Sequence, residues 1–223
     1  LPCSVLRHWH GGNKTMVRLL YQFPMWWQKM YRTATWRIQP ERKAVYLTFD
    51  DGPIPEVTPR VLDILRKYHV KATFFMVADN VRKHPEVYRQ VVAEGHSVGN
   101  HTFHHVKGMR LSTAAYLREV DKAAALLGNT RLFRPPYGRT WVWQRKALLQ
   151  RGYKIYLWDV LTHDYHRKYT PERMLAIIKT LTRNGSIINF HDSLKSNERM
   201  LQVLPQAIEW LQAEGYEILP IRN

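Results

Sequence analysis

The sequence predicts an α/β fold in which parallel strands lie inside and helices cover them. From residue 44 onward, short runs rich in β-branched and aromatic residues alternate with helical patterns, which is typical of repeated strand–helix units. The 223 residues contain no Gly/Ser-rich linker and no internal repeat, so we expect one main domain with a sizeable core. Polar segments follow the expected strands, as they do at the carboxyl ends of barrel strands.

The first half of the pattern begins with a strand over residues 44–50. A helix is expected over residues 57–69, followed by a strand of β-forming residues over 71–77. Residues 80–94 predict a further helix, but Pro85 indicates a break or a fresh start within it.

Capping residues mark the helices of the second half. Ser112 precedes a helical pattern that Gly128 ends, and Thr170 with Pro171 opens another helix. Pro205 indicates that the last helix is broken or starts afresh. The expected elements are an extended run over 96–100, helices over 112–127 and 140–150, an extended run over 153–160, a helix from 170, a strand over 185–190, a helix over 198–213 and a strand over 216–219.

Residues 1–41 precede this pattern, and we interpret them as an N-terminal extension to a main domain over residues 42–223. Residues 16–32 interleave aromatic side chains with Arg and Lys, so they either pack across the barrel or contact the headgroup zone of a bilayer. We expect no signal peptide in residues 1–15 and no transmembrane helix. Cys3 is the only cysteine, so we expect no internal disulfide.

The chain is strongly basic, with 34 Lys and Arg against 18 Asp and Glu and a net charge of +16. A field of this sign attracts nucleic acid, an anionic cell-wall polymer or an anionic membrane surface, although it also serves solubility alone. The basic residues are scattered and form no helix–turn–helix or aromatic RNA-binding signature, which disfavours nucleic acid. We therefore expect a protein associated with the cell envelope.

Two adjacent carboxylates, Asp50 and Asp51, end the first expected strand and precede Gly52 and Pro53. Like charges at the mouth of a buried strand repel each other and lose hydration, and a divalent metal would compensate both costs. The pair is therefore either a metal ligand beside a general base, or a helix cap followed by a turn, because Asp-Gly-Pro is favourable turn chemistry.

Two histidines, His101 and His105, follow the extended run over residues 96–100. They stand four residues apart, so one turn of helix would aim both side chains in the same direction. Two imidazoles and one carboxylate, with open positions for water, are the protein ligands of a catalytic zinc site. Histidines at this spacing also occur in cores and on surfaces, but beside the two aspartates they favour a metal site.

Five sequence blocks occur in the order found in the polysaccharide deacetylase family, and the chain resembles that family (the NodB homology domain, carbohydrate esterase family 4) over about residues 42–220. The blocks are residues 48–53, 101–105, 134–138, 158–165 and 187–192. The resemblance implies an irregular (β/α)7 barrel with seven rather than eight β/α units. It also implies a hydrolase that acts on chitin, chitooligosaccharides or peptidoglycan.

The resemblance implies a metal held by Asp51, His101 and His105. Zinc is the first choice for this ligand set, and cobalt, manganese or nickel could substitute for it. Such a metal lowers the pKa of bound water and polarises an acyl oxygen.

Asp50 is then the expected general base, and Arg134 the cation that keeps it ionised and aimed. A surface ion pair is the alternative for Arg134. His191 is the candidate general acid for the leaving amine, with Asp164 holding its imidazole in the protonated form. A lone histidine after an apolar strand is usually a core group, and only its place among the blocks favours a catalytic role. We interpret Asp192 as a cap.

Three further residues are expected at the substrate. The resemblance implies that the Tyr137 backbone N–H stabilises the oxyanion, while its phenol lines the groove. Trp158 either walls the acetyl pocket or belongs to the core. Asn189 stands where relatives usually place a leucine against the acetyl methyl group, so we expect a less apolar acyl pocket. We expect His104 to face outward.

The leading hypothesis is a metal-dependent hydrolase that removes N-acetyl groups from a glycan containing N-acetylglucosamine. The alternative is an amidase for another N-acylated aminosugar, such as a formylated sugar on a lipid carrier, which Asn189 and residues 16–32 motivate. In the fourth block, Leu161 replaces a common aspartate and Tyr165 a common tryptophan, while Asp164 is retained. A non-catalytic binding module is disfavoured because no member of the proposed set is missing.

Overall fold

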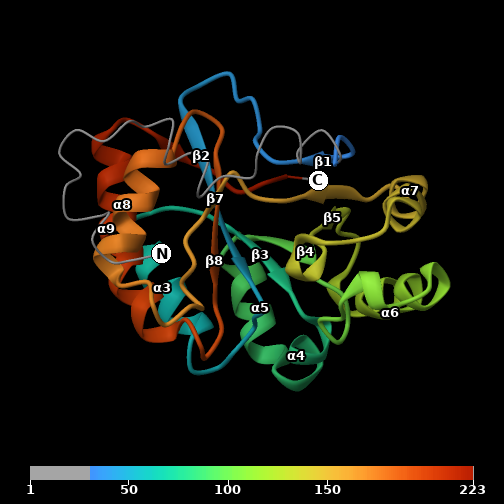
Figure 1. Cartoon of the computed structure of the whole chain (residues 1–223). Helices are drawn as coiled ribbons and strands as arrows, with labels where there is room; N and C mark the ends of the chain where they lie inside the picture. Colours follow the sequence, from blue (N-terminus) through green and yellow to red (C-terminus); the bar gives the residue numbers. More distant parts are fainter. Residues whose placement is uncertain (1–30, 223) are drawn as a thin grey trace.

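A curved sheet of parallel strands forms the centre of the computed structural model, which describes residues 31–222 (Figure 1). The strands are β1 (Ala34–Thr35), β2 (Ala44–Asp50), β3 (Thr73–Met76), β4 (Ser97–Asn100), β5 (Leu132–Phe133), β6 (Lys154–Tyr156), β7 (Val160–Leu161), β8 (Ile187–His191) and β9 (Glu217–Ile218). Their order is β1-β6-β5-β4-β3-β2-β8-β7, and β9 pairs with β2. The predicted parallel α/β barrel is confirmed; it is an open one, since no pairing of described strands joins β1 to β7.

Helices cover the outside of this sheet on two flanks (Figure 1). The helices are α3 (Thr58–Lys67), α4 (Ala78–Lys83), α5 (Pro85–Ala93), α6 (Thr113–Leu127), α7 (Val142–Gln150), α8 (Pro171–Leu181) and α9 (Asn197–Ala213). Helices α3 and α8 both pack against α9, and α6 packs against α4 and α7. Each helix therefore belongs to a strand–helix unit, as the alternating pattern predicted.

Side-chain caps begin two of the helices where the sequence placed them. The Ser112 hydroxyl accepts a hydrogen bond from the Ala115 N–H at 3.2 Å, and α6 follows. The Thr170 hydroxyl accepts one from the Arg173 N–H at 3.3 Å, at the start of α8. Each cap satisfies a backbone donor that the first turn of a helix leaves unpaired.

The two helix-breaking prolines behave differently. Pro85 begins α5 and separates it from α4, so the expected break is confirmed. The expected break at Pro205 is wrong, because α9 continues through it from Asn197 to Ala213. The buried neighbours Val203, Leu204, Ala207 and Ile208 pack this stretch into the main core, and that packing outweighs the one hydrogen bond that the proline removes. Strand β1 was missed because two residues carry no periodic signal.

Side-chain alternation along β2 and β8 separates the outer core from the inside of the barrel. Phe49 and Phe190 point outward and stack with ring centroids 5.7 Å apart, beneath the helices. The residues between them point inward, and the parallel register pairs Thr48 with Asn189 and Asp50 with His191. Strand pairing therefore brings two of the blocks together inside the barrel.

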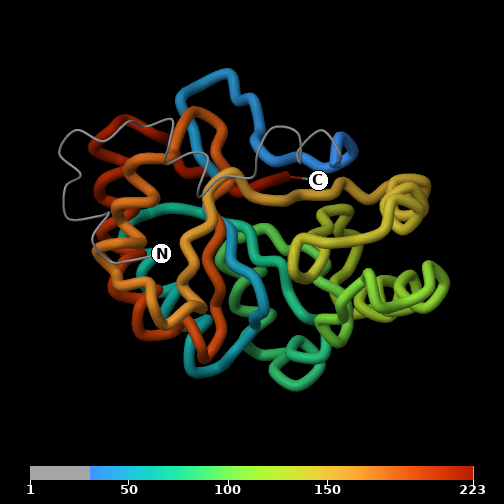
Figure 2. Tube along the Cα trace, viewed as in Figure 1, coloured from blue at the N-terminus to red at the C-terminus, as the bar shows by residue number. Residues whose placement is uncertain are grey.

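The two ends of the described chain meet beside the sheet. Tyr31, Trp36, Tyr46 and Ile221 belong to one buried cluster, and the red end of the trace runs next to its blue start (Figure 2). The two alternatives for residues 16–32 fall almost entirely outside the described residues, and the boundary at residue 41 stays a prediction. Within residues 31–222, no helix has the length and apolar character needed to cross a bilayer.

Candidate metal centre and active site

A cavity of about 1040 Å³ opens at the carboxyl ends of the strands. Asp50 and Asp51 lie at the end of β2, His101 and His105 follow β4, and His191 ends β8, and all five residues line this cavity. Side chains from three distant segments therefore share one space, as expected at this face of a barrel.

Three of these side chains form a group that could hold a metal ion. One ligand atom each from Asp51, His101 and His105 lies within 4.8 Å of the others. Asp51 Oδ1 lies 3.2 Å from His105 Nε2 and 3.8 Å from His101 Nε2. This oxygen is shielded from solvent and accepts no hydrogen bond from the described residues. A buried carboxylate oxygen without a donor needs a compensating cation, and two imidazole nitrogens beside it complete a ligand set that fits a divalent metal.

The backbone around Asp51 is held in an unusual conformation. Asp51 has a φ of 85°, and its carbonyl accepts a hydrogen bond from Asn80 Nδ2 at 2.8 Å. Gly52 follows because a Cβ at that position would lie 2.0 Å from an Asp192 oxygen. Asp192 accepts hydrogen bonds from the Gly52 N–H at 3.0 Å and the Thr58 hydroxyl at 2.6 Å. Burial raises the pKa of Asp192 to about 8, and its contacts tie the Asp51 loop to the start of α3.

The histidine pair lies on an irregular loop, so the expected helical turn is wrong. Thr102 has a φ of 65° and His105 a φ of 54°, values that no right-handed helix contains. The Asn100 side chain accepts a hydrogen bond from the Thr102 N–H at 2.9 Å, which closes the bend locally. The two imidazoles still face the same aspartate, with ring centroids 5.0 Å apart.

Hydrogen bonding prepares His101 as a ligand. Its Nδ1 lies 2.7 Å from the Arg134 carbonyl oxygen. A carbonyl only accepts, so Nδ1 carries the proton and the Nε2 lone pair faces Asp51. Burial lowers the pKa of His101 to about 4, which keeps the ring neutral at physiological pH.

Asp50 lines the same cavity as the metal group and is held there by a buried polar network. Arg134 Nη1 lies 2.7 Å from Asp50 Oδ1, 2.8 Å from the Thr48 hydroxyl and 2.6 Å from Asn189 Oδ1. Asn189 Nδ2 donates to the second Asp50 oxygen at 3.1 Å. Burial opposes ionisation of Asp50, but the adjacent Arg134 guanidinium, together with His101 and His191, outweighs it, and the pKa of Asp50 lies below its usual value.

Arg134 is an interior residue and not part of a surface ion pair. Its side chain has no solvent exposure. Nε donates to the Tyr156 carbonyl at 3.2 Å and Nη2 to the Leu157 carbonyl at 3.1 Å. The whole guanidinium is therefore hydrogen-bonded, which fixes the charge that Arg134 presents to Asp50.

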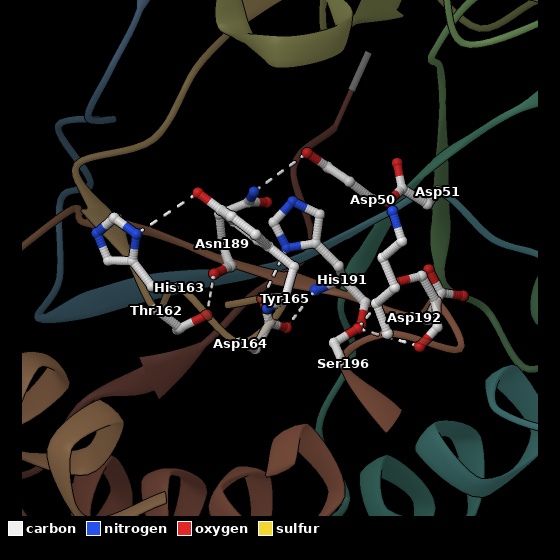
Figure 3. Close-up of polar contacts among 12 residues, drawn as sticks. Asp50, Asp51, Thr162, His163, Asp164, Tyr165, Asn189, His191, Asp192 and Ser196 are labelled. Carbon is white, nitrogen blue, oxygen red and sulfur yellow. Dashed lines mark hydrogen bonds and ion pairs between the residues drawn. The ribbon is translucent and has the colours of Figure 1, made fainter. Parts of the chain in front are cut away.

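His191 and Asp164 form a second pair (Figure 3). His191 Nδ1 lies 2.8 Å from Asp164 Oδ1, and the other Asp164 oxygen accepts the His191 backbone N–H at 2.7 Å. Burial disfavours the charged ring, but the fully buried Asp164 carboxylate, with smaller contributions from Asp51 and Asp50, outweighs it and raises the pKa of His191 to about 9. At neutral pH the imidazole is protonated and its Nε2–H is left for another partner.

The remaining predicted residues take different places. Tyr137 and Trp158 line the cavity, and the Tyr137 ring lies 4.8 Å from that of His105. Asn189 has no solvent exposure, and the cavity wall does not include it. Its amide faces Asp50 and Arg134 instead of the acyl pocket. His104 is half exposed and its Nδ1 lies 3.0 Å from Glu119, away from the metal group.

Thr48 belongs to the polar network around Asp50, although the sequence analysis assigned it no role. Its hydroxyl accepts from Arg134 and donates to Asn189 Oδ1 at 2.9 Å. The signal was present, since Thr48 stands two residues before Asp50 on a strand and so shares its face. Leu161 and Tyr165, noted only as departures from the family pattern, also line the cavity beside Trp158.

Comparison with known proteins gives a consistent result. Residues 37–156 match the model of the polysaccharide deacetylase family. The chain is 30% identical to a peptidoglycan-N-acetylglucosamine deacetylase of Bacillus cereus, with 84% of this chain and 91% of the relative covered. It is 34% identical to a chitooligosaccharide deacetylase of Bradyrhizobium, with 80% and 89% covered. A crystal structure of a peptidoglycan N-acetylglucosamine deacetylase bound to 4-naphthalen-1-yl-N-oxidanyl-benzamide superimposes with a TM-score of 0.83 at 27% identity, with 89% and 95% covered.

Proposed function

Because the chain belongs to the polysaccharide deacetylase family, we propose that it hydrolyses the N-acetyl group of N-acetylglucosamine in a glycan and releases acetate. One observation carries this proposal: a candidate metal group, a carboxylate paired with arginine and an imidazole paired with a carboxylate line the same cavity. Residues 42–223 are its catalytic domain, residues 1–41 an extension, and the cell envelope its place of action.

A divalent cation completes the site, held by Asp51, His101 and His105. Nitrogen and oxygen donors in this number suit zinc, and cobalt, manganese or nickel accept the same set. Bound there, it supplies Lewis acidity, which lowers the pKa of a water ligand and polarises the amide oxygen. Three protein ligands leave coordination positions open for water and substrate.

Asp50 acts as the general base that accepts a proton from the attacking water. The pKa of Asp50 is lowered because Arg134, together with His101 and His191, outweighs the effect of burial, so the carboxylate is ready to accept a proton at neutral pH. Arg134, Asn189 and Thr48 hold it in one orientation. These three are positioning residues. Asn189 was expected in the acyl pocket, and we propose that it positions Asp50 instead.

His191 acts as the general acid that protonates the leaving amine. Its raised pKa keeps the proton on the ring, and Asp164 at Nδ1 directs the free Nε2–H into the cavity. Base and acid come from paired positions of β2 and β8, so one proton is accepted by Asp50 and another is donated by His191 on neighbouring strands. The backbone N–H of Tyr137 completes the site as an oxyanion donor.

Trp158, Leu161 and Tyr165 form an apolar wall for the acyl group. A methyl group gains from such a wall, whereas a formyl hydrogen gains less. The case for a formylated substrate rested on a polar Asn189 in this pocket and on residues 16–32. Asn189 lies outside the cavity wall, and residues 16–32 fall almost entirely outside the described part of the chain. Acetyl is therefore the acyl group that the cavity favours.

The test is acetate release by metal-loaded protein from peptidoglycan and from N-acetylglucosamine oligosaccharides. We expect release that a chelator abolishes and added zinc restores. The variant Asp50→Asn should keep its metal, measured by elemental analysis, and lose the activity. Full metal occupancy without acetate from any of these glycans would contradict the proposal.

A further inference from the structure

Four exposed cations surround the mouth of the cavity. Lys107, Arg110, Arg139 and Lys195 all line it, and we call them the basic rim. None of the four forms an ion pair with a carboxylate in the described part of the chain. Lys107 Nζ lies 4.9 Å from the centroid of the Tyr137 ring, and this contact brings no opposite charge to the lysine.

The acidic groups near the rim are already matched. Asp79, which also lines the cavity, lies 2.6 Å from Lys83 and 2.8 Å from Arg82. Asp50 is paired with Arg134, and Asp51 belongs to the metal group. The mouth therefore presents an uncompensated positive field, and a cleft concentrates such a field on an incoming anion.

Exposed apolar side chains accompany these charges. Tyr137, Met109 and Leu194 line the cavity with more than a third of their surface exposed, at 52%, 42% and 65%. Beside them Trp141 stacks on Trp143 at 5.7 Å, and the Trp141 indole N–H donates to the Met109 carbonyl at 3.2 Å. Flat apolar surfaces of this kind suit the faces of sugar rings adjacent to the one in the cavity.

We propose that the basic rim binds a glycan strand that carries carboxylates on sugars next to the one deacetylated, so that this site prefers an acidic glycan to a neutral one. This inference rests on the proposed deacetylase function and names its substrate class. The rim residues line the same cavity as the metal group, so they are placed to contact the sugars on either side of one bound inside. A membrane surface needs no such continuity with the cavity, which favours the glycan.

The first experiment compares two substrates that differ only in charge. Peptidoglycan fragments with free carboxylates are compared with the same fragments after conversion of those carboxylates to methylamides. We expect kcat/KM for acetate release to be about tenfold higher for the acidic form at low salt, and the two values to converge near about 0.5 M salt. Equal values at low salt would overturn the inference while leaving the deacetylase function intact. No acetate from either form would instead refute the function itself.

The second experiment removes the rim charge. The variant R110Q/R139Q/K195Q is compared with R89Q/R118Q/K179Q, which removes the same charge from exposed positions outside the cavity wall. We expect the rim variant to lose the preference for acidic fragments through a higher KM, so that its kcat/KM values for the acidic and methylamide forms become equal. We expect the control variant to keep the preference. Equal loss of the preference for acidic fragments in both variants would show that the preference depends only on the net charge of the protein, and it would overturn the inference.

A third measurement separates the glycan from a membrane. Flotation with vesicles containing phosphatidylglycerol should be the same for the rim variant and the control variant. Selective loss of vesicle binding in the rim variant, with the preference for acidic fragments unaffected, would assign the rim to lipid and contradict the proposal.

Discussion

The inner faces of β2 and β8 carry two ion pairs of opposite design. On β2, the carboxylate Asp50 faces a buried guanidinium, and its pKa is lowered. On β8, the imidazole of His191 faces a buried carboxylate, and its pKa rises to about 9. The two groups are register partners in the sheet, yet their pKa values are shifted in opposite directions. In each case the charges of the neighbouring groups act against burial, and the sign of those charges sets the direction of the pKa shift.

Removing the base breaks this comparison most severely. Asp50→Asn leaves the metal group in place but removes the proton acceptor, so we expect kcat to fall by about 10²- to 10⁴-fold. Acetate release per bound metal ion, with metal measured by elemental analysis, gives the value. Activity within a few-fold of the wild type would show that another group accepts the proton.

Removing the Arg134 charge tests its pair with Asp50 through the free energy of unfolding. Arg134→Gln leaves the Asp50 carboxylate buried without its partner, and breaking a buried pair costs about 3–5 kcal/mol. Urea unfolding monitored by circular dichroism measures this loss. Arg151→Gln is the matched control, since its exposed pair with Asp121 should contribute no more than about 1 kcal/mol. Equal losses would contradict a buried, fixed role for Arg134.

Asn189→Leu tests the less obvious contact on the base side. The leucine removes hydrogen bonds to Asp50 and Arg134 from a fully buried position, at a cost of about 1–3 kcal/mol in stability. The ionised form of Asp50 loses a donor, so the acidic limb of the kcat profile should move to higher pH. Ile188→Val, on the outward face of the same strand, should lower stability slightly and leave that limb in place. An unmoved limb in Asn189→Leu would assign Asn189 to the core alone.

The order of the sequence blocks and the alternating pattern were enough to predict the parallel fold and most helices, because both can be read along the chain without knowing which residues meet in space. The contacts of the Asn189 side chain were not predictable, because they depend on which residues of the neighbouring strand β2 face it in the sheet. The histidine loop was missed because the positive φ values of Thr102 and His105 leave no trace in the four-residue spacing from which a helical turn was expected. The position of Thr48 on the same strand face as Asp50 could have been predicted from the two-residue period of a strand.

The pH dependence of kcat in wild type and in Asp164→Asn tests the central claim most directly. The raised pKa of His191 means that the acid is present at neutral pH and is lost as pH rises through about 9. Without the Asp164 charge the imidazole gives up its proton more easily, so the basic limb should move to lower pH while the acidic limb, set by Asp50, stays in place. Metal-loaded protein and acetate release provide the profiles. A basic limb at the same pH in both proteins would contradict the account, because it would show that the Asp164 pair does not control the acid.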